Sequence, residues 1–166
     1  MSIRRTTTLG TVAGLVLAFA ANGPAAAQGE ATLIPCFGEQ EVTPGNYDLF
    51  ATGWGTGSLG ALKQFLKSQT TLVTVTVDDG DPVTTNLTNG FGAPHPFDIG
   101  EGPSAWASDL IMPLGELESG QTLTVSVVST LSKPIVDFFK RPTPVDPSNL
   151  KAGDSPVTGS CTITVT

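Results

Sequence analysis

The stretch that decides the fold is Tyr47–Val77, YDLFATGWGTGSLGALKQFLKSQTTLVTVTV. Apolar and polar residues alternate in Tyr47–Thr52 and again in Thr71–Val77, which is the period of a half-buried strand. Between these two segments, a glycine-rich turn leads into a short amphipathic segment. The stretch therefore predicts a strand, a turn, one helix and a second strand.

The expected helix covers residues 58–68. Ser58 can cap the free N–H groups of a helix that begins at Leu59, and Lys67 lies near the C-terminus, where the helix dipole favours positive charge. One face is apolar, made by Leu59, Leu62, Phe65 and Leu66. Because ten residues form a marginal helix in isolation, we expect this face to dock on one open end or edge of a β-sandwich.

The rest of the chain predicts strands separated by turn signals. The stretch 89–104 is dense in glycine and proline and has no periodicity, and residues 140–160 are irregular, so we expect two long loops there. Pro113 should end its strand or place it at a sheet edge. The other expected strands are 31–34, 39–42, 82–87, 106–114, 121–131, 134–139 and 161–166. This pattern predicts an all-β, antiparallel two-sheet sandwich with one short helix.

The run from Trp106 to Leu131 includes SGQTLTVSV at Ser119–Val127. It resembles the later strands of immunoglobulin-like and fibronectin-type domains, and the whole pattern is similar to small secreted bacterial sandwich domains of unassigned function. The resemblance implies an immunoglobulin-like sandwich. It implies no functional residues, because sandwich folds host many unrelated functions.

The first 27 residues predict a signal peptide. Arg4 and Arg5 form a positive n-region, Leu9–Ala20 is apolar, and Ala25–Ala27 supplies small residues for cleavage. We expect a mature chain of residues 28–166 that forms a single domain and is secreted, either extracellular or periplasmic. No later apolar run is long enough to span a bilayer.

Charge and cysteines narrow the expected partners and compartment. The formal charge of −7 becomes −9 once the two leader arginines are removed, which argues against a nucleic-acid partner and against anionic membrane surfaces. The two cysteines of the chain, Cys36 and Cys161, are expected to form a disulfide that joins the first strand to the last.

Two motifs could hold a cofactor. Asp78, Asp79 and Asp81 surround Gly80 and suggest a calcium site, although Asp and Gly are equally typical of a turn between strands. Residues 55–60 match the dinucleotide pattern GxGxxG, but no alternation of strands and helices follows. We therefore expect a glycine turn there and no bound cofactor other than, at most, calcium.

The 89–104 loop and its border hold the candidate binding residues. Aromatic side chains beside carboxylates could stack on sugar rings or anchor a protein partner, or the aromatic rings could instead pack into the end of the sandwich. His95 is the only histidine of the chain, and no nucleophile motif frames it. The candidates are Phe91, His95, Phe97, Asp98, Glu101 and Trp106.

The sequence thus predicts a non-enzymatic binding or structural module for an extracellular protein or glycan, with residues 89–104 and 137–160 as possible contact surfaces. One alternative is an exported hydrolase acting through Asp98, Glu101 or His95, which would need two carboxylates at a defined separation. Another is an assembly subunit that exchanges a strand at an exposed sheet edge.

Overall fold

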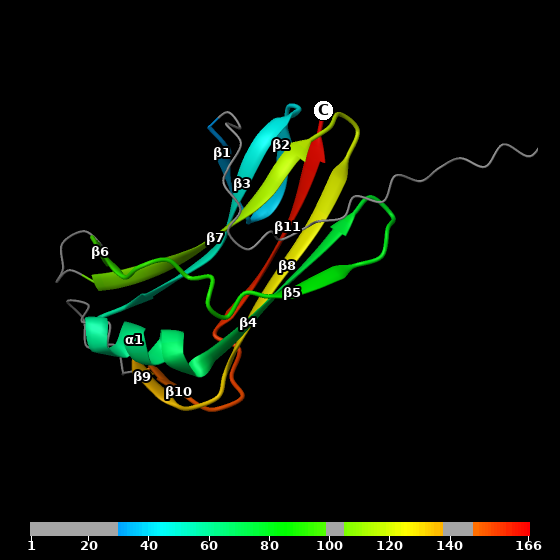
Figure 1. Cartoon of the computed structure of the whole chain (residues 1–166). Coiled ribbons are helices and arrows are strands. Elements are labelled where there is room, and N and C mark those ends of the chain that lie inside the picture. The colour runs from blue at the N-terminus through cyan, green and yellow to red at the C-terminus, as the bar shows by residue number, and fades with distance from the viewer. Residues whose placement is uncertain (1–29, 99–104, 138–147) are drawn as a thin grey trace, which may run out of the picture.

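The computed structural model describes residues 30–98, 105–137 and 148–166. Two sheets pack against each other, and a helix and a small two-stranded sheet lie at one end of the pair (Figure 1). The predicted all-β, two-sheet architecture with one short helix is confirmed. The predicted signal peptide, residues 1–27, lies outside the described residues. None of the helices in the described ranges has the length and apolar character needed to cross a membrane.

Each sheet has a distinct strand order. The four-stranded sheet runs β1-β3-β7-β6, the five-stranded sheet runs β2-β11-β8-β4-β5, and β9 pairs with β10. The elements are β1 Thr32–Pro35, β2 Gly38–Val42, β3 Gly45–Thr56, α1 Leu59–Ser68, β4 Gln69–Val77, β5 Val83–Asn86, β6 His95–Phe97, β7 Ala105–Leu117, β8 Thr122–Leu131, β9 Ile135–Asp137, β10 Ser148–Leu150 and β11 Val157–Val165.

The expectation of purely antiparallel sheets is wrong at two pairings. Strand β1 runs parallel to β3 in one sheet, and β2 runs parallel to β11 in the other. Both arise because the N-terminal segment leaves the first sheet after Pro35 and joins the second at Gly38. Gly38 has a φ of +63°, a backbone conformation that favours glycine, so the chain can turn between the sheets at this point.

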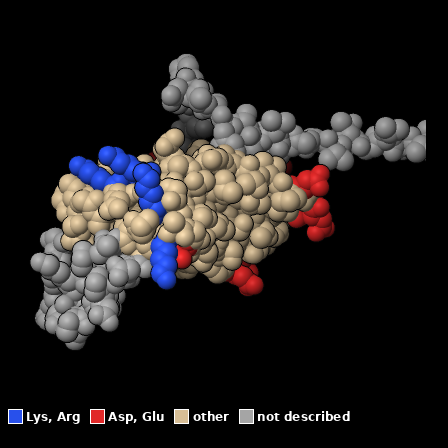
Figure 2. All heavy atoms as spheres, turned by 90° about the horizontal axis from the view of Figure 1, so that it is seen from below, with Lys and Arg blue, Asp and Glu red and all other residues tan. Residues whose placement is uncertain are grey.

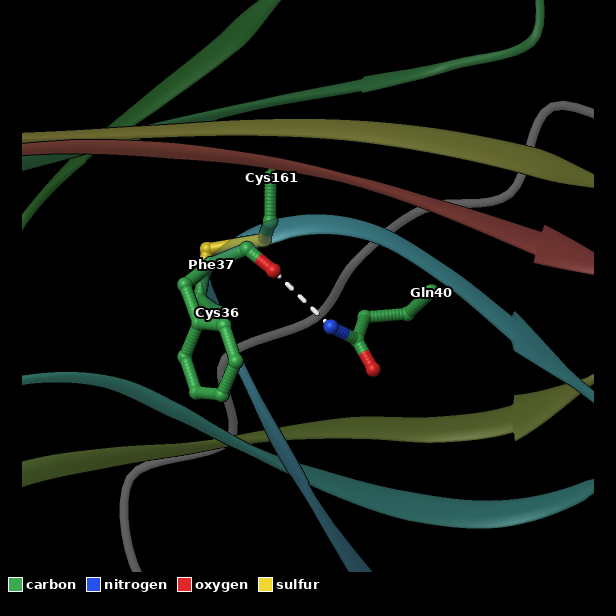
Figure 3. The surroundings of a disulfide bond; sticks show 4 residues. All are labelled: Cys36, Phe37, Gln40 and Cys161. Carbon is green, nitrogen blue, oxygen red and sulfur yellow. Dashed lines mark hydrogen bonds between the residues drawn. A yellow bond between two sulfur atoms is a disulfide. The ribbon is translucent and has the colours of Figure 1, made fainter.

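The predicted disulfide between Cys36 and Cys161 is confirmed and lies at this crossing point (Figure 3). The two Cα atoms are 5.1 Å apart. The Cys36 backbone N–H also donates to the Phe50 carbonyl of β3 at 2.9 Å, while the Gln40 side-chain amide donates to the Phe37 carbonyl at 2.8 Å. The disulfide thus ties the segment that joins the two sheets to the last strand.

Alternating side chains from both sheets form the main core. On β4, Val73 and Val75 are buried while Leu72 points outward and is 43% exposed, as the alternation predicted. The same inward face continues on the neighbouring strands β8 and β11, and the opposite sheet contributes apolar residues from β3 and β7. The largest fully buried members are Leu49, Leu110, Ile163, Val125, Val127 and Val165.

Helix α1 closes one end of the sandwich, as expected (Figure 1). Ser58 caps it, since the Ala61 backbone N–H donates to the Ser58 hydroxyl at 3.2 Å. Leu62 and Phe65 are fully buried in a second cluster with residues of β8, β9 and β11. Trp54, at the end of β3, stacks on Phe65 with ring centroids 5.0 Å apart. This helix therefore fixes the end of the sheet that carries Trp54.

Two expectations about the later chain need correction. The stretch 89–104 is not entirely loop, because β6 pairs with Ala105–Ala107 of β7 and Phe91 bridges to Leu110. A strand of three residues is too short to show a period in sequence. Similarly, the irregular stretch 140–160 contains β10 and the beginning of β11.

Strand β7 continues past Pro113 instead of ending there. Pro113 pairs with Asp48 of β3, whereas the described part of β6 reaches only Ala105–Ala107 on the other side of β7. Proline is tolerated where a strand has a ladder partner on one side only. Pro113 is thus at a local edge, which is the other outcome that the sequence predicted.

Candidate functional site: a groove on the four-stranded sheet

A hollow of about 460 Å³ opens on the outer face of the four-stranded sheet. Strands β3, β6 and β7 build it, so its residues come from three separate parts of the sequence. Aromatic rings, two glycines and one acid–histidine pair line it. The lining residues are Phe50, Gly53, Trp54, Gly55, His95, Phe97, Ala107 and Asp109.

The glycines of β3 create the space in this groove. The register of β3 on β7 shifts between Phe50 and Thr52, and Gly53 then pairs with Asp109. A Cβ atom on Gly53 would lie 2.9 Å from the Asp109 Oδ1 atom and 3.2 Å from the Phe50 Cζ atom. The absence of a side chain at Gly53 therefore lets both neighbouring side chains lie over the strand.

His95 and Asp109 form a hydrogen-bonded pair in the groove. The His95 Nε2 atom lies 2.9 Å from Asp109 Oδ2, and the two side chains are 47% and 33% exposed. The hydrogen bond to Asp109 raises the pKa of His95 above its ordinary value of 6.5, with a second contribution from the Pro96 carbonyl 3.3 Å from Nδ1. The hydrogen bond thus favours the imidazolium form of His95 more than solvent alone would.

Aromatic rings form the apolar part of the groove. Phe97 is 46% exposed, while Phe50 and Trp54 are partly buried. Trp54 contacts both the groove and the core, because its ring stacks on Phe65. Its indole Nε1 atom is buried and has no hydrogen-bond partner among the described residues. Trp54 therefore links the groove to the packing of helix α1, and Phe97 is the most exposed aromatic ring of the lining.

A second hollow of about 260 Å³ lies next to the first. His95 and Asp109 line both hollows, and the second is completed by Ile111, Gly90, Gly92 and Ala93. The hydrogen-bonded pair thus stands between two adjoining recesses. An elongated ligand could extend from one recess into the other past this pair.

The structure brings together only some of the predicted binding residues. His95 and Phe97 line the groove. Phe91 is half-buried and meets Phe65 edge to face at 5.8 Å, which matches the packing alternative. Trp106 is also half-buried, against the cluster beneath helix α1. Asp98 is exposed and does not line the groove, and Glu101 lies outside the described residues.

Sequence reasoning missed Phe50, Trp54 and Asp109 as groove residues. A signal existed for Phe50, because it alternates with the inward residues Tyr47, Leu49 and Ala51 and therefore had to point outward. No comparable signal existed for Asp109. Its partner His95 is 14 residues away, and their contact depends on the pairing of β6 with β7.

Of the three aspartates of the predicted calcium site, Asp78 has a structural role in the turn after β4. Asp78 has a φ of +51°, and its Oδ1 atom accepts a hydrogen bond from the Thr122 backbone N–H at 2.8 Å. In the described ranges, no three His, Cys, Asp or Glu side chains form a group that could hold a metal ion. Asp78 therefore fits the turn interpretation, and a calcium site at Asp78, Asp79 and Asp81 stays a prediction.

Charge is separated along the molecule (Figure 2). The lysines of the described ranges lie on α1 and on the connections after β8 and β10, all near the helical end: Lys63, Lys67, Lys133 and Lys151. In the view of Figure 2 the acidic side chains gather mainly on the opposite side. None of these lysines lines the groove, where the ionisable side chains are those of His95 and Asp109.

These features define a class of protein: an all-β, two-sheet sandwich with one disulfide and an aromatic groove on an outer sheet face. Comparisons of the chain with protein-family models, with curated proteins and with solved structures each find no match. The functional argument therefore rests on the groove itself.

Proposed function

We propose that the mature chain is a secreted, non-enzymatic binding module that holds a glycan in the groove of the four-stranded sheet. The observation that carries this proposal is the open groove in which aromatic rings adjoin the His95–Asp109 pair. Binding sites commonly combine apolar walls with a few placed polar groups that orient the ligand.

The chemistry of a sugar ring suits both kinds of lining group. Its C–H face is apolar and can lie against the exposed ring of Phe97 or the edges of Phe50 and Trp54. Its hydroxyl groups can donate to the Asp109 carboxylate, which can accept more hydrogen bonds than the one from His95. Because two recesses adjoin at this pair, an oligosaccharide fits the site better than a single sugar does.

Secretion is part of the proposal. The disulfide between Cys36 and Cys161 supports it, because such bonds persist in oxidising compartments. The leader pattern of residues 1–27 supports it independently. An extracellular or periplasmic location would also bring the groove into contact with surface glycans.

We further propose that the sandwich is immunoglobulin-like. The orders β1-β3-β7-β6 and β2-β11-β8-β4-β5 correspond to strands A-B-E-D and A′-G-F-C-C′ of that fold. Two features depart from the usual pattern. Strand β1 runs parallel to β3, and the disulfide joins the first-strand segment to the last strand instead of joining strands B and F.

The His95–Asp109 pair also raises the hydrolase alternative, since a base oriented by a carboxylate is part of many hydrolytic sites. A nucleophile would have to lie within reach of His95. Neither recess has a Ser, Thr or Cys among its described lining residues. The hydroxyl of the buried Ser108 donates to the Gly92 carbonyl at 2.7 Å and is occupied there. These observations favour binding over catalysis.

Melting curves with a panel of neutral and acidic oligosaccharides test the glycan proposal. A ligand that binds only the folded state raises the melting temperature. We expect at least one oligosaccharide to raise that of the wild type and to lose most of this effect with Phe97→Ala. Phe37→Ala is the matched control, because Phe37 is 66% exposed and lies outside the groove.

The expected pattern is a ligand-induced shift that Phe37→Ala keeps and Phe97→Ala loses. A second variant, Asp109→Asn, preserves the size of the side chain and should also weaken binding. A flat response of the wild type across the panel, or an equal shift in all variants, would overturn the proposal that this groove binds glycans.

A further inference from the structure

The outer face of the five-stranded sheet is a second surface with a very different composition. Strands β4, β8 and β11 contain no charged residue. Their inward positions are buried except at Val77 and Gly159, and Thr or Ser occupies all but two of the outward positions. The outward hydroxyl residues are Thr70, Thr74, Thr76, Thr122, Thr124, Ser126, Thr130, Thr158, Ser160, Thr162 and Thr164.

The register arranges these residues in rows across the sheet. Thr76, Thr124 and Thr162 face one another on β4, β8 and β11. The next row holds Ser126 between Thr74 and Ser160, and Thr84 of β5 extends it with a hydroxyl contact to Thr74 of 2.8 Å. The face is thus a regular array of small, uncharged side chains.

The two outward positions without a hydroxyl are neighbours. Leu72 on β4 pairs directly with Val128 on β8, and their side chains are 43% and 40% exposed. Thr158 and Asn86 flank this pair on the adjoining strands. The result is a small apolar centre within a polar, uncharged surround, which is the usual anatomy of a protein–protein interface.

The face is also large enough to carry an interface. Strands of nine or ten residues are about 30 Å long, and with the shorter strands β2 and β5 the sheet covers roughly 600 Å² at strand spacings of about 4.8 Å. Specific interfaces bury about 800 Å² on each partner, with weak ones below about 600 Å². An association through this face would therefore be weak and dependent on concentration.

We propose that the outer face of β4, β8 and β11 is a self-association surface that receives a second copy of this chain, related by two-fold symmetry. A chain of net charge −7, or −9 without the leader, repels its own copies. The three central strands β4, β8 and β11 carry no charge. The outward carboxylates Glu39 and Glu41 lie on the edge strand β2, beside Thr162 and Thr164. Two copies can therefore approach over the centre of the face, around Leu72 and Val128, without bringing like charges together there. A two-fold axis near Leu72 and Val128 would bury both apolar pairs against each other.

This inference does not depend on the proposed function, because the groove lies on the other sheet. Both surfaces can be occupied at once, and a variant in one leaves the other unchanged. Self-association would give the assembly two grooves on opposite sides, and a polymeric glycan that met both would be held more tightly than by one groove.

Sedimentation of the mature protein over a wide range of concentration tests the proposal. We expect the mass to rise from one chain towards two as the concentration increases. Leu72→Glu should stay at the mass of one chain, because it would place a carboxylate from each copy in the apolar centre. Leu33→Glu is the matched control, since Leu33 is 51% exposed on β1 of the other sheet and lines neither recess.

Both substitutions are at exposed positions, and equal melting temperatures of the two variants, measured at a concentration below association, verify that both fold. Association of wild type and Leu33→Glu, with none for Leu72→Glu, is the expected result. A wild type that remains a single chain at all concentrations would overturn the proposal. Association that persists in Leu72→Glu would also overturn it and would indicate pairing at a sheet edge instead.

Discussion

The two outer faces of this sandwich differ although both belong to sheets that are antiparallel apart from one parallel edge pairing each. On the five-stranded sheet, β-branched and hydroxyl residues follow an unbroken register, and the surface is a regular array of small side chains. On the four-stranded sheet, β3 has register shifts and the glycines Gly53 and Gly55, and the surface is hollowed and aromatic. Breaks in the register and missing side chains distinguish the face that can enclose a ligand from the face that can meet another surface.

The packing beneath each face differs as well. Behind the groove, Phe65 of α1 supports Trp54, one of the lining residues, so that part of the lining depends on the docked helix. Phe65 also contacts Phe91, which does not line the groove. The positions of the outward residues of the five-stranded sheet are set by the pairing of the strands that carry them. The predictions below compare the two faces and begin with the largest expected effect.

Phe65→Ala should destabilise the protein strongly. Phe65 is fully buried and contacts both Trp54 and Phe91, and truncating a buried Phe costs about 3–5 kcal/mol. On the other face, Leu72→Ala should change the free energy of unfolding by no more than about 0.5 kcal/mol, the usual range for a surface site. Denaturant unfolding measures both, and equal effects would contradict the assignment of Phe65 as the support of the groove.

Replacing both Cys36 and Cys161 by Ala should lower the free energy of unfolding by about 2–4 kcal/mol. The disulfide closes a loop of sequence separation 125 and holds the segment that joins the two sheets. Thermal or denaturant unfolding of the double variant measures this. Reduction of the wild type with a thiol provides the control, and a stability unchanged by either treatment would contradict a structural role of the bond.

Two glycine substitutions compare one strand of each sheet, with Gly159 paired with the inward residue Val127 and Gly53 on the outer face in the groove. Gly159→Ala, on β11, has nothing within 4 Å of the new Cβ atom, so it should stabilise by about 0.5–1 kcal/mol, because glycine weakens a strand. Gly53→Ala would meet Asp109 and Phe50, and should destabilise by about 1 kcal/mol and narrow the groove. Unfolding curves give the signs, and the same sign in both variants would contradict the difference drawn here.

Of the predicted changes, the protonation of His95 should have the smallest effect on stability. Because its pKa is raised in the folded state, the ion pair with Asp109 adds stability below pH 6.5, and this contribution is lost as the pH rises through the raised pKa. His95 is the only histidine, so one imidazole NMR signal reports it. Its midpoint should exceed 6.5 and fall with Asp109→Asn. An unchanged midpoint in that variant would mean that the pair does not form in solution.

Sequence patterns predicted the frame better than the site. The bounds of α1, its Ser58 cap and the inward positions of β4, β8 and β11 follow local rules of periodicity and capping, and the structure agrees with them. Strand β6 was missed because three residues hold no period. Its pairing with β7 depends on distant contacts, and those contacts bring His95 to Asp109.

The parallel pairings of β1 and β2 were missed for a similar reason. No pattern in residues 32–42 indicates that the segment passes from one sheet to the other. The direction of pairing is determined by the neighbouring strands β3 and β11. The outward position of Phe50, in contrast, could have been inferred from the same alternation that placed Leu49 in the core.

Amide NMR spectra of the labelled mature protein test most directly whether the two faces have separate roles. One series of spectra is recorded during dilution, and a second during addition of an oligosaccharide that raises the melting temperature. The account predicts that dilution shifts signals of β4, β8 and β11, whereas the oligosaccharide shifts signals around Gly53, His95 and Asp109. If both treatments shifted the same signals, or if neither shifted those of its assigned face, the account of two faces with separate roles would be contradicted.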